Sequence, residues 1–392
     1  MGDDVEVIRR ELPSLKRYIE QEANNRCTDL SKESGELRGS NPWHGSSTGN
    51  NFAVDPDNDR WFCHSKGHKQ GGGIFEFIAV DEGLVDCGHT KDISTVFPEV
   101  LEIAAEKAGV DLDMDAHDKA KAKQRREKRQ QLDDLYEEAT AFYHEQLDVA
   151  VPTPDGDDVT TVRQWITDKY GLDDDTINTA MVGFAPNKDT ALIDAVSADQ
   201  KLLLESGLAI STQGGVVDFF DGRVMFPYFE RGKPRYFIGR QTPITPDHDW
   251  ERAKYKKVPR PDGNEHVSEL IEEPIYGRDG VRDAEHVIIT EGVTDVLAAK
   301  QYGYTAIAPV TTSFKQDKVY DVAQLVRGKD VTVIMDEDAE TQAGIQGSLK
   351  TAKCLEKRTG PATNVRVARL PIEDGDICDY LRDQGGRQEV AP

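Results

Sequence analysis

Hydrophobic and polar residues follow two different periods in the last third of the chain. Short apolar runs, such as HVIIT at 286–290 and DVTVIM at 330–335, are separated by longer segments in which apolar residues recur every three or four positions. Short runs of this kind are typical of buried strands, and the longer spacing is typical of helices that cover them. Strands that alternate with helices favour a parallel sheet, because parallel strands need crossover connections. We therefore expect an α/β fold for residues 285–392.

The middle of the chain has a different pattern. Residues 117–131, HDKAKAKQRREKRQQ, are charged and carry almost no large apolar residues, which is typical of a solvated helix or linker. Residues 132–147 then place leucine and aromatic residues at helical spacing, which predicts an amphipathic helix. Further along, RVMFPYFERGKPRYFIGRQ at 223–241 predicts two strands around a turn.

These changes of pattern divide the chain into four parts. A chain of 392 residues is long enough for two or three domains, each with its own core. We place a domain of short helical and strand-like pieces at residues 1–112 and a charged linker helix at 113–131. A mixed α+β domain follows at 132–284, and the α/β domain occupies 285–392.

The charge of the chain limits the classes of function. There are 48 Lys and Arg residues against 72 Asp and Glu, which gives a formal net charge of −24. Neutralising DNA phosphates needs Lys and Arg, so any nucleic-acid site requires a local basic cluster. Excess surface carboxylate also keeps a protein soluble at very high salt, where screening removes self-repulsion. We interpret the composition as halophilic.

The sequence shows no export or membrane signal. No apolar run approaches the roughly 20 residues of a membrane-spanning helix. The start, MGDDVEVIRRELP, is acidic, whereas a signal peptide has a basic start and an apolar middle. We therefore expect a cytoplasmic protein with no membrane partner. The five cysteines are an odd number, scattered over the chain, and do not indicate a disulfide framework.

Acidic residues follow two of the predicted strands. Glu291 comes directly after the first strand, Asp295 lies in the helix that follows, and Asp336 and Asp338 end the other strand. Ligands of open parallel sheets bind beyond the carboxyl ends of the strands, and alternation points Asp336 and Asp338 to the same side. Oxygen-only ligand sets suit Mg²⁺ or Mn²⁺. We predict that Glu291, Asp336 and Asp338 bind the metal, with Asp295 as a supporting residue or a further ligand. The alternative is that these residues cap helices or solvate the surface.

The two acidic motifs, Glu-Gly-x-x-Asp and Asp-x-Asp, resemble the TOPRIM domain that primases, topoisomerases and some nucleases share. The residues upstream resemble DnaG-type primases, with Arg-x-x-Phe-Pro at 223–227, Gly-Arg at 239–240, AKYKKVPRP at 253–261 and EEPIYG at 272–277. This resemblance covers about residues 40–385. It implies a TOPRIM parallel sheet flanked by helices, preceded by a primase-type mixed basic domain and a zinc-ribbon-like β module. It also implies metal-dependent synthesis of RNA primers on single-stranded DNA from ribonucleoside triphosphates.

The middle domain supplies the local basic cluster that the overall charge lacks. The resemblance implies that its basic residues line the path of template and nucleotides, with tyrosine available for stacking. The residues concerned are Arg223, Arg240, Lys254, Tyr255 and Lys256. The alternative is a solvated hairpin with Lys at a sheet edge, where charge prevents aggregation.

Residues 41–83 resemble the zinc ribbon of the family but lack part of its ligand pattern. That pattern is Cys-Pro-x-His followed by Cys-x-x-Cys, and the chain has Asn41 and Lys66 at two of these ligand positions. The remaining candidate ligands are His44 and Cys63, with His68, His64 and Cys27 as replacements. A structural zinc site is tetrahedral and closed, so two ligands do not hold the ion.

A ribbon that folds without metal is the other interpretation. Its core would then come from aromatic residues, namely Trp43, Phe52, Trp61, Phe62 and Phe75. Since only two ligands match, we expect no tightly bound zinc. Cys87, Cys354 and Cys378 have no partner spacing, and we interpret them as small core residues.

The resemblance leads to one expected function and two alternatives. We expect a primase, which is a DNA-directed RNA polymerase. The alternatives are a TOPRIM nuclease and a non-catalytic accessory protein that binds single-stranded DNA. Asp376 and Asp379, in an acidic turn near the end, either assist the metal site or cap a helix. The chain has no Gly-x4-Gly-Lys-[Ser/Thr] phosphate loop, so we expect any replicative helicase to be a separate chain.

Overall fold

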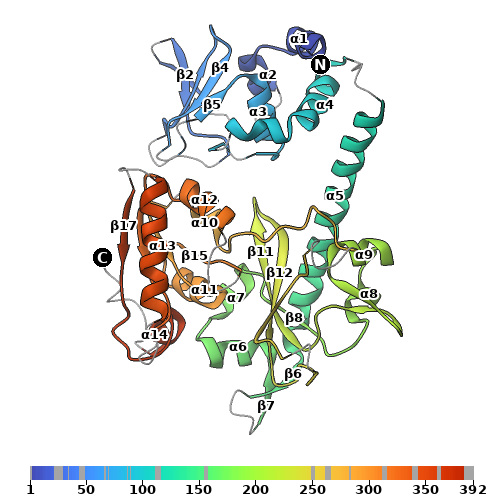
Figure 1. Ribbon diagram of the computed structural model, residues 1–392, viewed down its shortest axis with the longest axis vertical. Helices are drawn as coiled ribbons and strands as arrows, with labels where there is room; N and C mark the ends of the chain where they lie inside the picture. The colour runs from blue at the N-terminus through green and yellow to red at the C-terminus, as the bar shows by residue number, and fades with distance from the viewer. Residues whose placement is uncertain are drawn as a thin grey trace. The chain divides into compact units, whose positions relative to one another are not determined.

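The structure, a computed structural model, consists of two compact units (Figure 1). The first comprises Met1–Lys128 and Ala323–Lys329, and the second comprises Arg129–Val322 and Asp330–Pro392. The structure describes residues 2–21, 30–33, 35–43, 49–65, 68, 70–85, 87–88, 90–110, 116–153, 158–248, 252–260, 266–281, 284–310, 316–337, 343–359 and 363–383. The finer division into four domains stays a prediction.

The first unit contains an antiparallel sheet whose strands pair in sequence order. The strands are β1 (Ser31–Glu33), β2 (Glu36–Gly39), β3 (Phe52–Asp55), β4 (Arg60–Cys63) and β5 (Gln70–Gly72). The helices are α1 (Gly2–Glu11), α2 (Leu15–Gln21), α3 (Ile74–Asp81), η1 (Thr90–Thr95) and α4 (Phe97–Ala108). Helix α3, IFEFIAVD, is apolar on most of its surface and is largely buried, so it forms the centre of this core.

Strand β4 alternates between buried and exposed side chains. Trp61 and Cys63 are buried and Arg60 and Phe62 are exposed, because only one face of the sheet packs on the core. Four of the predicted aromatic core residues pack in this core, namely Trp43, Phe52, Trp61 and Phe75. The prediction is wrong for Phe62, whose side chain lies on the other face and is 38% exposed.

Helix α5 (Ala116–Glu145) is continuous across the charged segment and the amphipathic segment that follows it. Residues 123–131 are largely exposed, and the buried positions begin at Leu132, followed by Leu135, Tyr136 and Ala139. The change from exposed to buried side chains therefore occurs within one helix. Among the described residues, no helix has the length and apolar character needed to cross a membrane.

The second unit contains an antiparallel sheet with the strand order β13-β12-β11-β8. Strands β11 (Arg223–Glu230) and β12 (Lys233–Gln241) form the predicted hairpin, closed by Arg231 and Gly232, which both have positive φ. Positive φ at both turn residues matches the twist of the paired strands. The other elements of this part are η2 (Gln146–Asp148), β6 (Ala150–Pro152), β7 (Val159–Thr161), α6 (Val162–Tyr170), α7 (Asp174–Thr179), β8 (Gly183–Ala185), α8 (Ala191–Ala195), α9 (Gln200–Ser206), β9 (Ala209–Thr212), β10 (Gly215–Asp218) and β13 (Tyr255–Lys257).

The predicted parallel sheet is present, with the strand order β15-β14-β16-β17. Its elements are α10 (Arg278–Val281), β14 (His286–Ile289), α11 (Val293–Gln301), β15 (Ala306–Ile307), α12 (Gln316–Leu325), β16 (Asp330–Val333), α13 (Ala343–Thr359), β17 (Asn364–Val367) and α14 (Ile377–Asp383). Helix α11 packs on β15, and α13 packs on β16 and β17 (Figure 1). The connection from β14 leads to β15 at one edge of the sheet, and the connection from β16 leads to β17 at the other edge. Because both crossovers are right-handed, α11 and α13 lie on opposite faces of the sheet. The ends of β14 and β16 therefore border a topological switch point, where ligands of open α/β sheets bind.

Candidate active site at the ends of two parallel strands

Glu291 and Asp336 lie at this switch point. Glu291 follows β14 and begins the turn into α11, and Asp336 follows β16. The two strands are neighbours that pair in register along their length, so their carboxyl ends lie side by side. The backbone N–H of Asp336 hydrogen-bonds to the carboxylate of Glu291. The structure thus brings these two residues together.

The carboxyl groups at this edge of the sheet have raised pKa values. Burial is the main cause that raises the pKa of Asp336 to about 7, and the neighbouring charges of Glu291 and Asp376 add to it. Burial also raises the pKa values of Glu291 and Asp376. Carboxylates held close together resist full ionisation unless a cation separates them. An oxygen-only group of this kind fits a hard divalent cation such as Mg²⁺ or Mn²⁺.

Asp338, the third predicted metal ligand, lies outside the described residues. Its neighbour Glu337 is held near the end of β17. The Glu337 carboxylate accepts a hydrogen bond from the Arg369 guanidinium at 2.6 Å and one from the backbone N–H of Leu370 at 3.1 Å. Asp336 is instead influenced by the charge of Glu291, which follows β14, so the two adjacent acidic residues have different partners.

Asp295 is buried in the first turn of α11, with 2% of its surface exposed. Its Oδ2 accepts hydrogen bonds from Thr290 Oγ1 at 3.1 Å and from the backbone N–H of Gly292 at 3.0 Å. Its Oδ1 faces the backbone N–H of Cys378 at 3.4 Å. A carboxylate is stabilised at a helix N-terminus by the unpaired N–H groups there. Asp295 therefore joins the turn that carries Glu291 to the start of α14, which suits a supporting role.

The acidic turn before α14 adds a carboxylate to the cluster. Asp376 accepts a hydrogen bond from the backbone N–H of Asp379 at 2.8 Å, as a helix-capping residue does. Its charge also raises the pKa of Asp336. Asp379 forms an ion pair with Arg382 at 3.0 Å. Asp376 thus caps a helix and contributes to the acidic cluster, so the two sequence interpretations are compatible.

Lys254 is a cation that faces the acidic cluster. It lies directly before β13 and is exposed. Its charge opposes the rise in the pKa values of Glu291, Asp336 and Asp376. A Lys ammonium offers three N–H donors on a flexible stem, so it can bind an anion placed beside these carboxylates.

Arg240 and Lys169 extend this positive charge. Burial lowers the pKa of Lys169, at the end of α6, and the charges of Arg240 and Lys254 lower it further. Cations held close together favour an anion between them. Sequence reasoning missed Lys169, because a Lys in the last turn of a helix is ordinarily explained by the helix dipole.

Strand β13 presents its residues to two faces. The Tyr255 ring lies near both Arg240 Cζ, 5.4 Å from the ring centroid, and Lys254 Nζ, 5.9 Å from it. Lys256 points to the opposite face, where its Nζ is 4.2 Å from the ring centroid of Phe219. Tyr255 therefore belongs to the site, and the structure does not bring Lys256 to it.

Arg223 has a different place from the one expected of a nucleic-acid contact. It is fully buried, and its guanidinium donates to the backbone carbonyls of Gly239 at 3.2 Å and Ala253 at 3.1 Å. These carbonyls directly precede Arg240 and Lys254. Arg223 thus fixes the backbone that carries the exposed Lys254 and the half-buried Arg240, and we correct its expected role to one of positioning.

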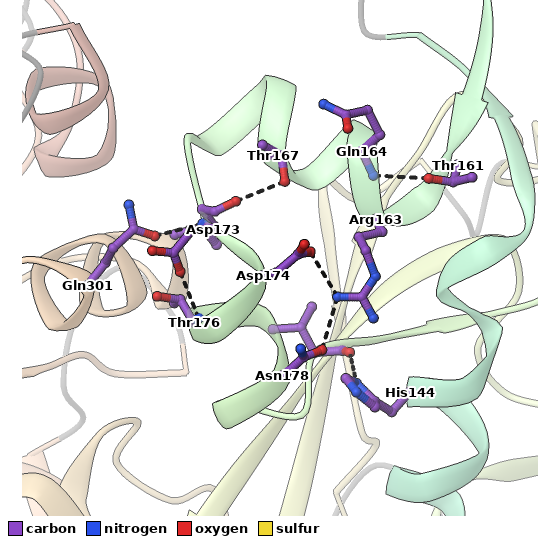
Figure 2. A network of polar contacts seen from close by, with 12 residues as sticks. His144, Thr161, Arg163, Gln164, Thr167, Asp173, Asp174, Thr176, Asn178 and Gln301 are labelled. Atoms are coloured by element: carbon purple, nitrogen blue, oxygen red, sulfur yellow. Dashed lines mark hydrogen bonds and ion pairs between the residues drawn. The ribbon is translucent and has the colours of Figure 1, made fainter.

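A polar network holds the α6–α7 segment in place (Figure 2). Arg163 donates to Asp174 Oδ1 at 3.2 Å and so joins α6 to α7. Gln301, the last residue of α11, accepts a hydrogen bond from the backbone N–H of Asp173 at 2.8 Å. Helix α11 begins at the acidic cluster, so this network ties the segment that follows Lys169 to the same helix.

The first unit holds a second group of ligand-type side chains. Of the candidate zinc ligands, Cys63 and His68 are close, with 3.7 Å between Cys63 Sγ and His68 Nδ1. His44 and Cys27 lie outside the described residues. Cys87 is buried, as expected, but its Sγ is also 3.2 Å from His68 Nδ1. Its long spacing from Cys63 matches no zinc pattern, so no motif indicates this contact.

Comparison with known proteins finds similarity to DNA primases. Residues 153–261 match the model of the DNA primase catalytic core, N-terminal domain. A DNA primase of Halalkalibacterium halodurans is 27% identical over 400 residues, which cover 98% of this chain and 58% of that protein. A DNA primase of Deinococcus radiodurans is 26% identical over 371 residues, which cover 91% of this chain and 56% of that protein. The chain thus spans less than two thirds of the length of these relatives.

Solved primase structures share the fold. The Aquifex aeolicus primase, with zinc binding and RNA polymerase domains, matches with a TM-score of 0.53 and 21% identity over 97% of this chain and 82% of that one. A DnaG primase catalytic domain bound to ssDNA matches with a TM-score of 0.52 and 22% identity over 66% of this chain and 78% of that one. The chain is therefore similar to DnaG-type primases in sequence and in fold. Arg240 and Lys254 lie inside the segment that matches the family model, and the acidic cluster follows it in sequence.

Proposed function

We propose that the chain is a DNA primase, which joins ribonucleotides into a short RNA primer on a single-stranded DNA template. One observation carries the proposal, namely that a carboxylate cluster and a group of cations meet at the switch point. The carboxylates are Glu291, Asp336 and Asp376, and the cations include Lys254 and Arg240. The names of the relatives, and a matched primase structure with bound ssDNA, support the same function.

The carboxylates are the proposed metal ligands. Glu291 and Asp336 hold Mg²⁺ or Mn²⁺ together with Asp338, which the sequence places after the same strand. When bound, these ions neutralise charge on the phosphates of the incoming nucleotide. Asp295 keeps the Glu291 turn in position through its buried hydrogen bonds.

The cations bind the negatively charged substrates. Lys254 and Arg240 contact phosphates of the triphosphate or the template, and Arg223 holds the backbone of both in place. Tyr255 offers an aromatic surface beside them. The nucleophile is the 3′-hydroxyl of the primer itself, so this chain contributes positioning and electrostatic stabilisation.

The proposal includes the finer expectations drawn from the sequence. The parallel sheet is a TOPRIM domain, the location is cytoplasmic, and the partners include a replicative helicase. A TOPRIM nuclease is less favoured, because Lys254 and Arg240 belong to the segment that matches the primase core model. A non-catalytic accessory protein is less favoured, because the carboxylates remain clustered.

The test is a primer-synthesis assay with labelled ribonucleotides, a single-stranded template and Mg²⁺ or Mn²⁺. Asp336→Asn and Glu291→Gln keep the side-chain size and remove the charge. The matched control is Asp330→Asn, at the exposed start of the same strand as Asp336. We expect each site variant to lose at least about 100-fold in rate, since metal-assisted charge stabilisation contributes several kcal/mol. The control stays within about twofold of wild type.

The same reactions separate the alternative functions. Primer synthesis at the wild-type rate by both site variants contradicts the proposal. Cleavage of a labelled template without synthesis favours the nuclease. Template binding with neither activity favours the accessory protein.

A further inference from the structure

Two cysteines and one histidine converge in the first unit from three segments of the chain. Cys63 ends β4, His68 lies in the connection to β5, and Cys87 follows α3. His68 Nδ1 is 3.7 Å from Cys63 Sγ and 3.2 Å from Cys87 Sγ. The three ligand atoms all lie within 4.8 Å of one another.

Hydrogen bonding alone does not account for this convergence. A histidine ring nitrogen carries either one hydrogen or one lone pair, so Nδ1 of His68 serves one thiol at a time. Thiols are weak hydrogen-bonding groups, and directing two of them at one nitrogen gains little. A cation between the three atoms satisfies all of them, because thiolate and neutral imidazole are both electron-pair donors.

The distances fit a tetrahedral zinc ion. With Zn–S near 2.3 Å and Zn–N near 2.0–2.1 Å, a sulfur and a nitrogen bound to one ion lie roughly 3.6 Å apart. The observed distances from His68 Nδ1, 3.7 Å to Cys63 Sγ and 3.2 Å to Cys87 Sγ, differ from this by a few tenths of an ångström. Small side-chain rotations therefore suffice to close the site around an ion.

The surrounding backbone holds the cluster in place. Cys63 and Cys87 are 0% and 4% exposed, and His68 is half-buried. Cys63 pairs with Gln70 between β4 and β5. His68 lies between these two paired residues in sequence, so strand pairing holds its segment at both ends. A Cβ at Gly88 would lie 3.3 Å from the His68 ring, so the backbone at this glycine packs directly beside the ring.

Asn41 shows how the family pattern is altered in this chain. It occupies the position of the first cysteine of the pattern, and its buried side-chain amide nitrogen is 3.6 Å from Cys87 Sγ. An amide N–H directed at sulfur stabilises the thiolate, which is the metal-binding form. The structure thus places another cysteine beside the residue that replaced the first one.

We propose that Cys63, His68 and Cys87 bind one Zn²⁺, with His68 and Cys87 in place of the ligands missing at Asn41 and Lys66. Sulfur together with imidazole favours Zn²⁺ over Mg²⁺ or Mn²⁺, and a water molecule can complete the coordination. The sequence led to the expectation of no tight zinc, because it did not reveal Cys87 as a third ligand. This proposal is independent of the proposed function, since none of its residues lies in the acidic cluster.

The test measures zinc in the full chain, purified from zinc-supplemented medium without chelator. Cys63→Ser, Cys87→Ser and His68→Asn are compared with wild type and with Cys354→Ser, a control in helix α13 of the second unit. We expect about one zinc ion per chain in wild type and control, and at least about tenfold less in each ligand variant. Reconstitution with Co²⁺ reports sulfur ligands directly, through thiolate-to-cobalt absorption that weakens in each cysteine variant.

Two results overturn the proposal. One is a folded wild-type chain that takes up no zinc and shows no thiolate-to-cobalt absorption. The other is a Cys87→Ser variant that holds zinc as wild type does. If a ligand variant does not fold, the wild-type cobalt spectrum still decides. Asp336→Asn is expected to keep its zinc, so failure of this proposal is distinguishable from failure of the proposed function.

Discussion

Neighbouring residues in this protein have different roles because extended segments present alternate side chains to opposite sides. Asp336 faces the acidic cluster, whereas Glu337 accepts hydrogen bonds from Arg369. Tyr255 faces the site, whereas Lys256 packs on an aromatic ring of the other face. For Asp336 and Glu337 the chemical type does not distinguish the two neighbours, and the direction of each side chain does.

The first residue-scale prediction concerns the two lysines beside Tyr255. Lys254→Met should lower kcat/KM for ribonucleotide incorporation by about 10-fold or more, since a hydrogen bond to a charged group contributes about 1.5–3 kcal/mol. Lys256→Met should change it by less than about threefold, because the Lys256 ammonium lies over the Phe219 ring. Steady-state kinetics with varied nucleotide concentration measure both. Equal losses in the two variants would show that the contact of Lys256 with Phe219 does not keep this lysine away from the nucleotide.

The second residue-scale prediction concerns stability without divalent cations. Asp336→Asn should be at least as stable as wild type in Mg²⁺-free buffer, because it removes a half-buried charge beside Glu291 and Asp376. Adding Mg²⁺ should then raise the midpoint of thermal unfolding in wild type but not in the variant, since binding stabilises only a chain that has the site. Thermal unfolding with and without Mg²⁺ measures this. A variant that is less stable by about 1 kcal/mol or more without Mg²⁺ would assign Asp336 a structural role.

At the scale of elements, the acidic cluster depends on how closely helix α13 approaches the end of β16. A Cβ at Gly344, in the first turn of α13, would lie 1.8 Å from the backbone carbonyl oxygen of Asp336. Helix and strand end can approach this closely only because residue 344 has no side chain. The sequence contains this glycine, but nothing in its local pattern indicates the contact.

Substitution of this glycine gives an element-scale prediction. Gly344→Ala should lower the free energy of unfolding by about 1–3 kcal/mol, because the added methyl group overpacks the contact. It should also reduce primer synthesis by about 10-fold or more, because Asp336 must shift. The matched control is Gly347→Ala in the same helix, where a Cβ meets no atom within 4 Å. That control should be neutral or more stable by about 0.5–1 kcal/mol, since alanine favours helix. Denaturant titration measures the free energy of unfolding of both variants. Equal changes in the two would contradict the close contact between Gly344 and Asp336.

At the scale of the whole molecule, the site is a local exception to the overall charge. The chain has a net charge of −24, yet in the second unit the charges of Arg240 and Lys254 both act on Lys169. A local cluster of this kind can bind phosphates although the molecule as a whole repels them. High salt weakens both the local attraction and the overall repulsion of phosphates. At high salt, direct hydrogen bonds from these side chains therefore contribute a larger share of phosphate binding.

The composition predicts how stability responds to salt. Raising KCl from about 0.1 M to about 1 M shortens the Debye length from roughly 10 Å to 3 Å and screens repulsion among the surface carboxylates. The midpoint of thermal unfolding should therefore rise, by about 2–4 °C for each kcal/mol gained. Thermal unfolding in a KCl series measures this, with a neutral osmolyte at matched osmolality as the control. A midpoint that falls with KCl, or that rises equally with the osmolyte, would contradict the halophilic interpretation.

The sequence by itself determined the elements and their order. Apolar periods are local properties, so they predicted the hairpin of β11 and β12, the amphipathic part of α5 and the parallel sheet. The same periods placed Glu291 and Asp336 at the ends of two strands, which pairing then brought together. These predictions needed only strand and helix geometry.

Only the tertiary structure decided which distant residues meet. It brought Cys87 to His68, Lys169 to Arg240, and the guanidinium of Arg223 to the carbonyl of Ala253. Each of these contacts joins segments whose separation in sequence carries no recognisable pattern. Their geometry is fixed by the packing of whole elements, which the spacing of residues along the chain does not encode.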